Sequence, residues 1–283
     1  MRKLQNGVIL ATISLGIDKT NSVYNWGMEK AEIIVFDLDQ TLTESKSPLD
    51  VEMNDLLCDL LRIKKVAVIS GASFKQFQDQ FLDHLVCPPE LLSKLYLLPT
   101  DGAAFYEYKD KWQCVYNHAL AVEEKQKIIK AFEETFLETG FKREERIFGE
   151  LIEDRGSQIT FSGLGMKAPI ELKEKWDPDR KKREVLEENL LKKIPEYSIK
   201  LGGTTSIDIT PKGIDKAFGI EALMKNLNLS KEQVFYVGDA FYKDGNDTSI
   251  IRLNIGYKSV GDPGIEDTKQ FIREFIKQSQ MGV

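Results

Sequence analysis

Three short apolar runs, separated by long amphipathic stretches, are the feature that most limits how this 283-residue chain can fold. The runs lie at 33–36, 66–70 and 234–238 and read IIVF, VAVIS and VFYVG. They are rich in β-branched residues and do not alternate with polar ones, which is typical of strands buried on both faces of a parallel sheet. Because parallel strands need crossover connections, the pattern predicts an α/β fold with a Rossmann-like, doubly wound parallel sheet.

The stretches between the first runs fit the helices that such a sheet requires. Apolar residues recur at helical spacing within 49–63, and Ser73 with Gln76 forms a capping box at the start of the next expected helix. A further strand is expected at 94–100. This β-α-β-α-β order favours a right-handed, doubly wound arrangement.

The order of expected helices and strands changes in the middle of the chain. A hairpin is expected at 103–117, followed by a long amphipathic helix that ends at Gly140. Strands with turns are expected at 146–165, and a highly charged helix at 177–194 with Pro178 at its start. Two more strands follow, so this stretch predicts a separate α+β unit.

We therefore expect a discontinuous core domain at 28–116 and 210–283, with an inserted α+β cap domain at 117–209. Residues 1–27 have a basic start and a short apolar run, as secretory signals do. They lack a small-residue cleavage site, and the run is too short to cross a bilayer. We expect a disordered extension, with Met28 as an alternative start; a signal peptide is the other interpretation.

Charge and cysteine content limit the partners. The net charge of −6 is spread along the chain without a Lys/Arg-rich block, which argues against a nucleic acid or membrane partner. The cysteines Cys58, Cys87 and Cys114 are odd in number and far apart, without metal-ligand spacing. We expect reduced thiols in a cytoplasmic protein. The sequence leaves open whether the protein is a monomer or a homodimer.

Polar residues follow the apolar runs at the points where the strands should end. Asp37 and Asp39 follow the first run, Ser70 ends the second, and Asp239 follows the third. The carboxyl ends of parallel strands form the binding crevice of an open α/β sheet, so neighbouring strands would bring these residues together. Clustered carboxylates repel one another unless a cation lies between them, and Mg²⁺ prefers oxygen ligands.

A single aspartate after a strand is most often a turn or helix-cap residue, so each position alone is a weak signal. Several such residues, each at the end of a hydrophobic strand, favour a magnesium site over coincidence. The Ser70–Gly71 pair adds a hydroxyl and exposed backbone N–H groups, which suit the oxygens of a phosphate.

Four segments resemble the motifs of the haloacid dehalogenase superfamily, in the family's order. They are DLDQT, VISGAS, GIDKAFGIEAL and VGDAFYKDGND. The insert between the second and third motifs resembles the large α/β cap of Cof-type phosphatases and eukaryotic phosphomannomutases. The mutase likeness extends to the segments DGAAFYEYKDKWQCVYNH, EDRGSQITFS and GGTTSIDITPKGIDK.

The resemblance implies a role for each matched residue. Asp37 would be the nucleophile that takes the phosphoryl group, and Asp39 the general acid and base. Mg²⁺ would be bound by the carboxylates of Asp37 and Asp239 and by the backbone carbonyl of Asp39. Ser70 and a lysine would neutralise the phosphoryl oxygens. We favour Lys216, which would head the following helix, over the neighbouring Lys212.

The sequence departs from the family pattern in two places. Gln40 stands where the family usually has glycine, so either the turn tolerates a side chain or its shape is altered. The fourth motif has a longer loop, in which Asp244 either binds the metal or stabilises the turn. We place Asn246 with the phosphate-binding residues and Asp247 with the metal-binding residues, as support for the ion and for the lysine.

The cap would set the substrate. Arg155 matches one cationic cap position of the mutases, and its alternative is a surface salt bridge. The arginine that follows SPIG in the mutases is absent after SGLG, where Met166 and Lys167 stand. We therefore expect a Mg²⁺-dependent phosphatase acting on a small phosphate ester, such as a sugar phosphate. Phosphomannomutase is the first alternative and a non-catalytic phosphosugar-binding protein the second.

Overall fold

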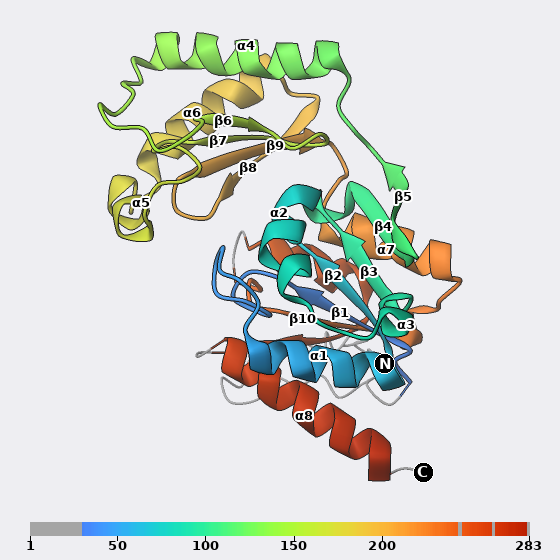
Figure 1. Cartoon of the computed structure of the whole chain (residues 1–283). Coiled ribbons are helices and arrows are strands. Elements are labelled where there is room, and N and C mark those ends of the chain that lie inside the picture. The colour runs from blue at the N-terminus through green and yellow to red at the C-terminus, as the bar shows by residue number, and fades with distance from the viewer. Residues whose placement is uncertain (1–29, 243–244, 262–263, 282–283) are drawn as a thin grey trace, which may run out of the picture.

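The computed structural model describes residues 30–242, 245–261 and 264–281. These residues form two lobes, each built on its own β-sheet (Figure 1). The expected extension at 1–27 lies outside the described residues. In the described part of the chain, no helix has both the length and the apolar character needed to cross a bilayer.

The large lobe contains a seven-stranded sheet in the order β11-β10-β1-β2-β3-β4-β5. The five strands from β11 to β3 are parallel, and β4 and β5 add an antiparallel hairpin at one edge. The predicted α/β fold is therefore confirmed. The strand bounds are β1 (Ile33–Asp37), β2 (Lys65–Ile69), β3 (Leu95–Leu98), β4 (Ala104–Lys109), β5 (Lys111–Asn117), β10 (Val234–Gly238) and β11 (Gly256–Ser259).

Both faces of this sheet are covered, which explains why the central strands β1 and β2 are apolar apart from Asp37 and Lys65 at their ends. On β1, Ile34 and Phe36 face one apolar cluster, whereas Ile33 and Val35 face another. Helices α1 and α8 lie side by side against the first face, and α7 packs on the second (Figure 1). The helices of this lobe are α1 (Val51–Ile63), α2 (Phe74–Gln80), α3 (Pro89–Leu92), α7 (Lys216–Leu227) and α8 (Ile265–Met281), with short 3₁₀ segments η1 (Leu82–His84), η2 (Thr100–Gly102), η3 (Lys231–Gln233) and η4 (Asn246–Leu253).

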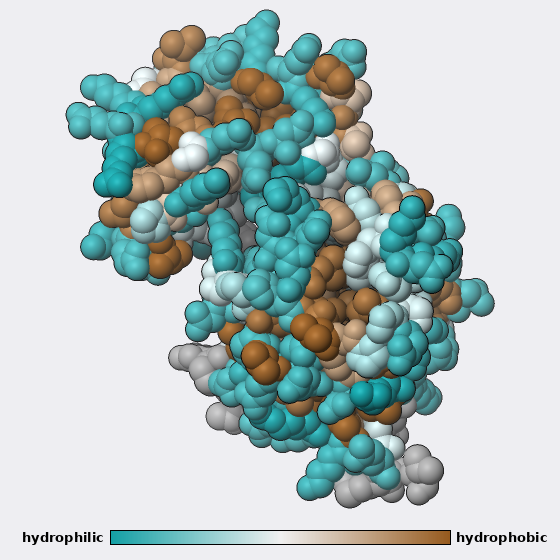
Figure 2. All heavy atoms as spheres, viewed as in Figure 1, coloured by the Kyte–Doolittle hydropathy of each residue, from teal (hydrophilic) through white to brown (hydrophobic). Residues whose placement is uncertain are grey.

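The small lobe, which runs from α4 to β9, contains a four-stranded antiparallel sheet in the order β6-β7-β9-β8. Helices α4 and α6 cover the sheet face that points away from the large lobe (Figure 1). Figure 2 shows a recess on one side where the lobes meet. The bounds are α4 (Val122–Thr139), β6 (Ile152–Asp154), β7 (Ile159–Ser162), α5 (Ile170–Trp176), α6 (Lys181–Lys193), β8 (Tyr197–Gly202) and β9 (Ser206–Pro211). The domain boundaries at 117 and 209 stay a prediction.

The small lobe corrects two expectations. Helix α5 was not predicted from the sequence, and the charged helix expected at 177–194 starts at Lys181 rather than near Pro178. The Asp177 carboxylate accepts hydrogen bonds from the backbone N–H groups of Lys182 and Arg183, at 3.0 and 3.2 Å. This aspartate therefore satisfies two of the N–H groups that lack a partner in the first turn of α6. The same carboxylate pairs with the buried Arg183 guanidinium at 2.8 Å.

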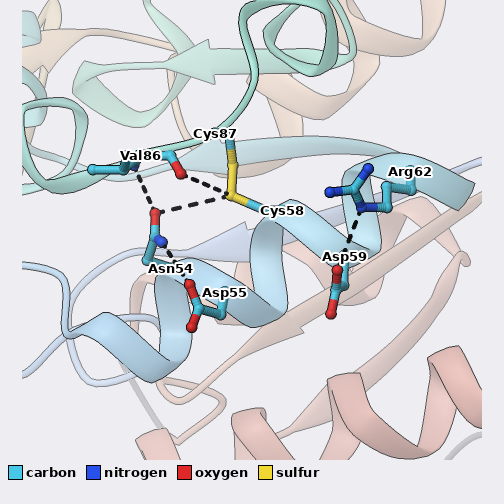
Figure 3. Close-up of a disulfide and its surroundings, with 7 residues drawn as sticks. All are labelled: Asn54, Asp55, Cys58, Asp59, Arg62, Val86 and Cys87. Carbon is cyan, nitrogen blue, oxygen red and sulfur yellow. Dashed lines mark hydrogen bonds and ion pairs between the residues drawn. A yellow bond between two sulfur atoms is a disulfide. The ribbon is translucent and has the colours of Figure 1, made fainter.

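The prediction of reduced cysteines is wrong for two of the three. Cys58 of α1 and Cys87, just before α3, form a disulfide (Figure 3). Cys114 is free and exposed. Beside the bond, Asn54 Oδ1 accepts the backbone N–H of Val86 at 2.7 Å, which holds the Cys87 segment against α1. Residues distant in sequence can pair when the fold brings them together, and spacing does not reveal such a pair. The cytoplasmic location stays a prediction.

We predict that the denatured, unreduced protein has one titratable thiol, that of Cys114. Reduction should raise the number to three. Because the bond links residues 29 apart, reduction should also lower the free energy of unfolding by about 3 kcal/mol. Dithionitrobenzoate titration with and without prior reduction measures the thiols, and the Cys114→Ser variant should give none before reduction. Three thiols before reduction would contradict the disulfide.

Two glycines bring α7 against the turn that follows β3. A Cβ on Gly102 would lie 2.2 Å from Gly219 Cα, and one on Gly219 would lie 2.8 Å from Gly102 Cα. Gly102 also has a φ of +85°, which only glycine adopts without strain. This close approach positions the first turn of α7, where Lys216 lies.

We predict that Gly102→Ala destabilises the protein more than Gly213→Ala does. Both glycines have a φ of +85°, but a Cβ on Gly213 would meet no heavy atom within 4 Å. The cost of placing alanine at this φ is therefore the same in both variants. The difference between their free energies of unfolding then measures the clash with α7, which should be about 1–3 kcal/mol. Chemical denaturation of both variants tests this. Equal losses of stability in the two variants would mean that the contact between Gly102 and Gly219 does not position α7.

Candidate active site

The carboxyl ends of three adjacent strands bring the predicted residues together. Strand β1 lies between β10 and β2, with Phe36 opposite Val237 and Asp37 opposite Ile69. Asp37, Ser70 and Asp239 therefore lie at one edge of the sheet, as the sequence predicted.

A buried lysine lies at the centre of this edge. Lys216 Nζ donates to Asp37 Oδ1 and to Asp247 Oδ1, each at 2.6 Å, and the Lys216 side chain is 0% exposed. The preceding residue, Asp215, caps α7 by accepting the backbone N–H of Phe218 at 3.0 Å. The structure thus places Lys216 at Asp37, whereas Lys212 is exposed.

Burial and the opposite charges control protonation at this site. Burial alone would lower the pKa of Lys216, but the charges of Asp247 and Asp37 outweigh it and raise the pKa above its usual value. Burial raises the pKa of Asp37, and the Lys216 charge opposes that effect. Lys216 is therefore a fixed cation beside carboxylates that are costly to ionise without further positive charge.

Three carboxylates offer a cation site. Oxygen atoms of Asp37, Asp239 and Asp247 all lie within 4.8 Å of one another. Burial raises the pKa of Asp239, and the Asp247 charge raises it further. Clustered oxygen donors with unbalanced negative charge suit a hard divalent cation such as Mg²⁺. The Asp39 side chain is not part of this cluster, and Asp244 lies outside the described residues.

Asp247 is already engaged by protein donors. Its Oδ1 accepts from Lys216 and from the Tyr236 hydroxyl, and its Oδ2 accepts the backbone N–H of Ala240 at 2.8 Å. Asp37 and Asp239 therefore have more oxygen lone pairs free for a cation. Tyr236 was not predicted as a site residue, although a hydroxyl inside a buried apolar strand needs a hydrogen-bond partner and is a signal for one.

The side chain of Asp39, two residues after Asp37, is held in a defined orientation. Its Oδ1 accepts the backbone N–H of Lys46 at 2.7 Å and the Gln80 amide at 3.0 Å. The next residue, Gln40, has a φ of +61° and an exposed side chain. Position 40 thus has a left-handed backbone without glycine, which lowers the free energy of unfolding by about 1–2 kcal/mol.

The remaining predicted residues lie around this cluster. The Ala72 backbone N–H donates to Ser70 Oγ at 3.1 Å, and Gly71 is half-buried. Arg155 donates to the Gly71 carbonyl at 3.0 Å and pairs with Glu153 at 2.7 Å, so it bridges the two lobes as well as forming a salt bridge. Asn246 begins η4, and its side chain is exposed.

Comparison with known proteins assigns the family. The model for haloacid dehalogenase-like hydrolases matches residues 34–253, which is most of the chain. This protein belongs to that family. It is 26% identical to a phosphomannomutase of Encephalitozoon cuniculi over 90% of this chain and 97% of the relative.

Two solved structures have a similar fold. A haloacid dehalogenase-like hydrolase of Bacteroides thetaiotaomicron has a TM-score of 0.61 at 17% identity, with 87% of this chain and 99% of that chain covered. An IMP-nucleotidase of Plasmodium falciparum has a TM-score of 0.61 at 17% identity, with 88% and 69% covered. Both likenesses concern the fold.

This haloacid dehalogenase-like protein also gathers cations where the lobes meet. Lys173 of α5 is buried, and its burial together with the nearby charges of Lys46 and Arg155 lowers its pKa to about 8. Like charges held this close favour an anion among them. Lys46 and Lys173 were not predicted from the sequence, because they are far apart in the chain and neither lies in a distinctive local pattern.

We predict that Lys216→Met lowers the free energy of unfolding by about 3–5 kcal/mol in the presence of EDTA. The substitution leaves the buried carboxylates of Asp37 and Asp247 without their counter-charge. Lys212→Met is the matched control, because that lysine is exposed, and it should change stability little. Chemical denaturation measures both. Similar stability of the two variants would contradict the importance of the buried pair.

Proposed function

We propose that this family member is a Mg²⁺-dependent phosphatase that hydrolyses small phosphorylated metabolites, with sugar phosphates as the substrate class. The observation that carries the proposal is the buried Lys216 ammonium, which lies 2.6 Å from Asp37 beside a group of three carboxylates. A nucleophile, a fixed cation and a metal-binding carboxylate pair are what transfer of a phosphoryl group to a side chain requires.

In the proposed reaction, an Asp37 oxygen attacks phosphorus and the bond to the ester oxygen breaks. Asp39 donates its proton to the departing oxygen, which leaves as an alcohol. Water then attacks the aspartyl phosphate and gives a proton to Asp39, and inorganic phosphate is released. Mg²⁺ held by Asp37 and Asp239 would supply the charge neutralisation that Lys216 alone does not.

The turn after β2 would bind the phosphoryl oxygens. Ser70 Oγ accepts the Ala72 N–H, so the hydroxyl proton of Ser70 remains for a phosphoryl oxygen. Gly71 would add its backbone N–H, and Asn246 would approach from the start of η4. The small lobe would act as the cap over this pocket, and its movement would admit substrate and water.

Phosphomannomutase is the second candidate, and two observations favour it. The cations Lys46, Lys173 and Arg155 could bind a second phosphate where the lobes meet. The relative of Encephalitozoon cuniculi is also named a phosphomannomutase. The absence of the mutase arginine after SGLG makes us prefer the phosphatase.

We predict that the protein releases inorganic phosphate from sugar phosphates and that EDTA abolishes the release until Mg²⁺ is added. Asp39→Asn should lower turnover about 10²–10⁴-fold, because the proton donor is lost. It should leave Mg²⁺ affinity, measured by calorimetry, unchanged. Asp110→Asn, at an exposed hairpin tip, is the matched control and should keep full turnover.

The same reactions distinguish the alternatives. Conversion of mannose 6-phosphate to mannose 1-phosphate with a bisphosphate activator, faster than phosphate release, would replace the phosphatase with the mutase. Sugar phosphate binding without either reaction would favour the non-catalytic protein. Undiminished turnover of Asp39→Asn would remove Asp39 from its proposed role.

A further inference from the structure

Asp101, in the turn after β3, has a carboxylate that the reaction above does not use. The residue is half-buried, and its Oδ1 is a buried atom without a hydrogen-bond partner in the described part of the chain. Its backbone is left-handed, with a φ of 55°. An unpaired buried acceptor and a strained backbone both cost stability, so their coincidence at one residue points to a function rather than to folding.

Asp101 lies between the proposed phosphate-binding turn and the interface of the two lobes. Both of its carboxylate oxygens lie 3.8 Å from the point where a Cβ on Gly71 would stand. Its backbone N–H donates to the Ser70 carbonyl at 2.9 Å. The preceding Thr100 shares a 2.6 Å hydroxyl contact with Ser157 of the small lobe. The carboxylate is thus beside the proposed phosphate site, on the side where the small lobe begins.

The charges around Asp101 indicate what kind of group it can accept. Burial raises its pKa, and the charges of Lys216 and of Lys200 on the small lobe partly offset this effect. Among the described residues, neither lysine forms a direct ion pair with the Asp101 carboxylate, and Lys216 pairs instead with Asp37 and Asp247. An ionised carboxylate repels the phosphate dianion, so its partner should be the neutral, donor-bearing part of the ester.

We propose that Asp101 accepts a hydrogen bond from a hydroxyl group of the sugar part of the substrate. The inference rests on the proposed function and deepens it, since it makes Asp101 a residue that selects polyhydroxylated phosphate esters. A site with a buried acceptor discriminates strongly against a ligand that lacks the matching donor, because the acceptor is then left unpaired.

The test compares substrates with and without sugar hydroxyls. Asp101→Asn removes the charge but retains the left-handed turn, which asparagine tolerates, and Asp101→Gly removes the acceptor without backbone strain. For the best hexose phosphate, we expect kcat/KM to fall about tenfold in Asp101→Asn and further in Asp101→Gly. For p-nitrophenyl phosphate, which carries no hydroxyl, both variants should retain the wild-type value.

Deoxy analogues of the hexose phosphate identify the hydroxyl. The loss of kcat/KM caused by Asp101→Asn should disappear with the analogue that lacks the bound hydroxyl and persist with the others. Equal losses of kcat/KM on the aryl and sugar esters would overturn the inference, because Asp101 would then act on the reacting phosphate rather than on a sugar hydroxyl. No loss on either ester would overturn it as well. A wild-type protein that hydrolyses none of these esters would overturn both this inference and the proposed function.

Discussion

The ion pair between Lys216 and the carboxylates of Asp37 and Asp247 is the interaction on which the site depends. It joins residues 179 and 31 positions apart in the sequence, and all three side chains are buried or nearly so. A buried charge without a partner is costly, so the Lys216 ammonium and the two carboxylates hold one another in place, with one negative charge left unbalanced. The Tyr236 hydroxyl and the Ala240 N–H complete the environment of Asp247.

The two glycines at 102 and 219 make this pairing possible. They let α7 approach the turn after β3 without side chains between them, and Lys216 lies one turn before Gly219. The same contact places Asp101 beside the helix. The cation, the proposed phosphate-binding turn and the proposed hydroxyl acceptor thus lie around one contact in the large lobe. The small lobe adds Arg155 and Lys173 from across the interface.

The sequence was most informative where the signal is local. Buried strands such as β1, the Ser73 capping box and the end of α4 at Gly140 follow from neighbouring residues, and the structure contains all three. Asp37 and Asp239 could be placed at one edge because strand ends in parallel sheets converge. Features made by distant contacts could not be predicted: the Cys58–Cys87 bond and the cations around Lys173.

The strand order of the large lobe has a consequence for synthesis on the ribosome. Strand β1 pairs on one side with β2, which follows soon after, but its other neighbour is β10, which begins at Val234. Until that late segment emerges, a central strand with four consecutive apolar residues has an open edge that could pair with another nascent chain. The whole small lobe is translated during that interval, so its length adds to the time for which this edge stays unpaired.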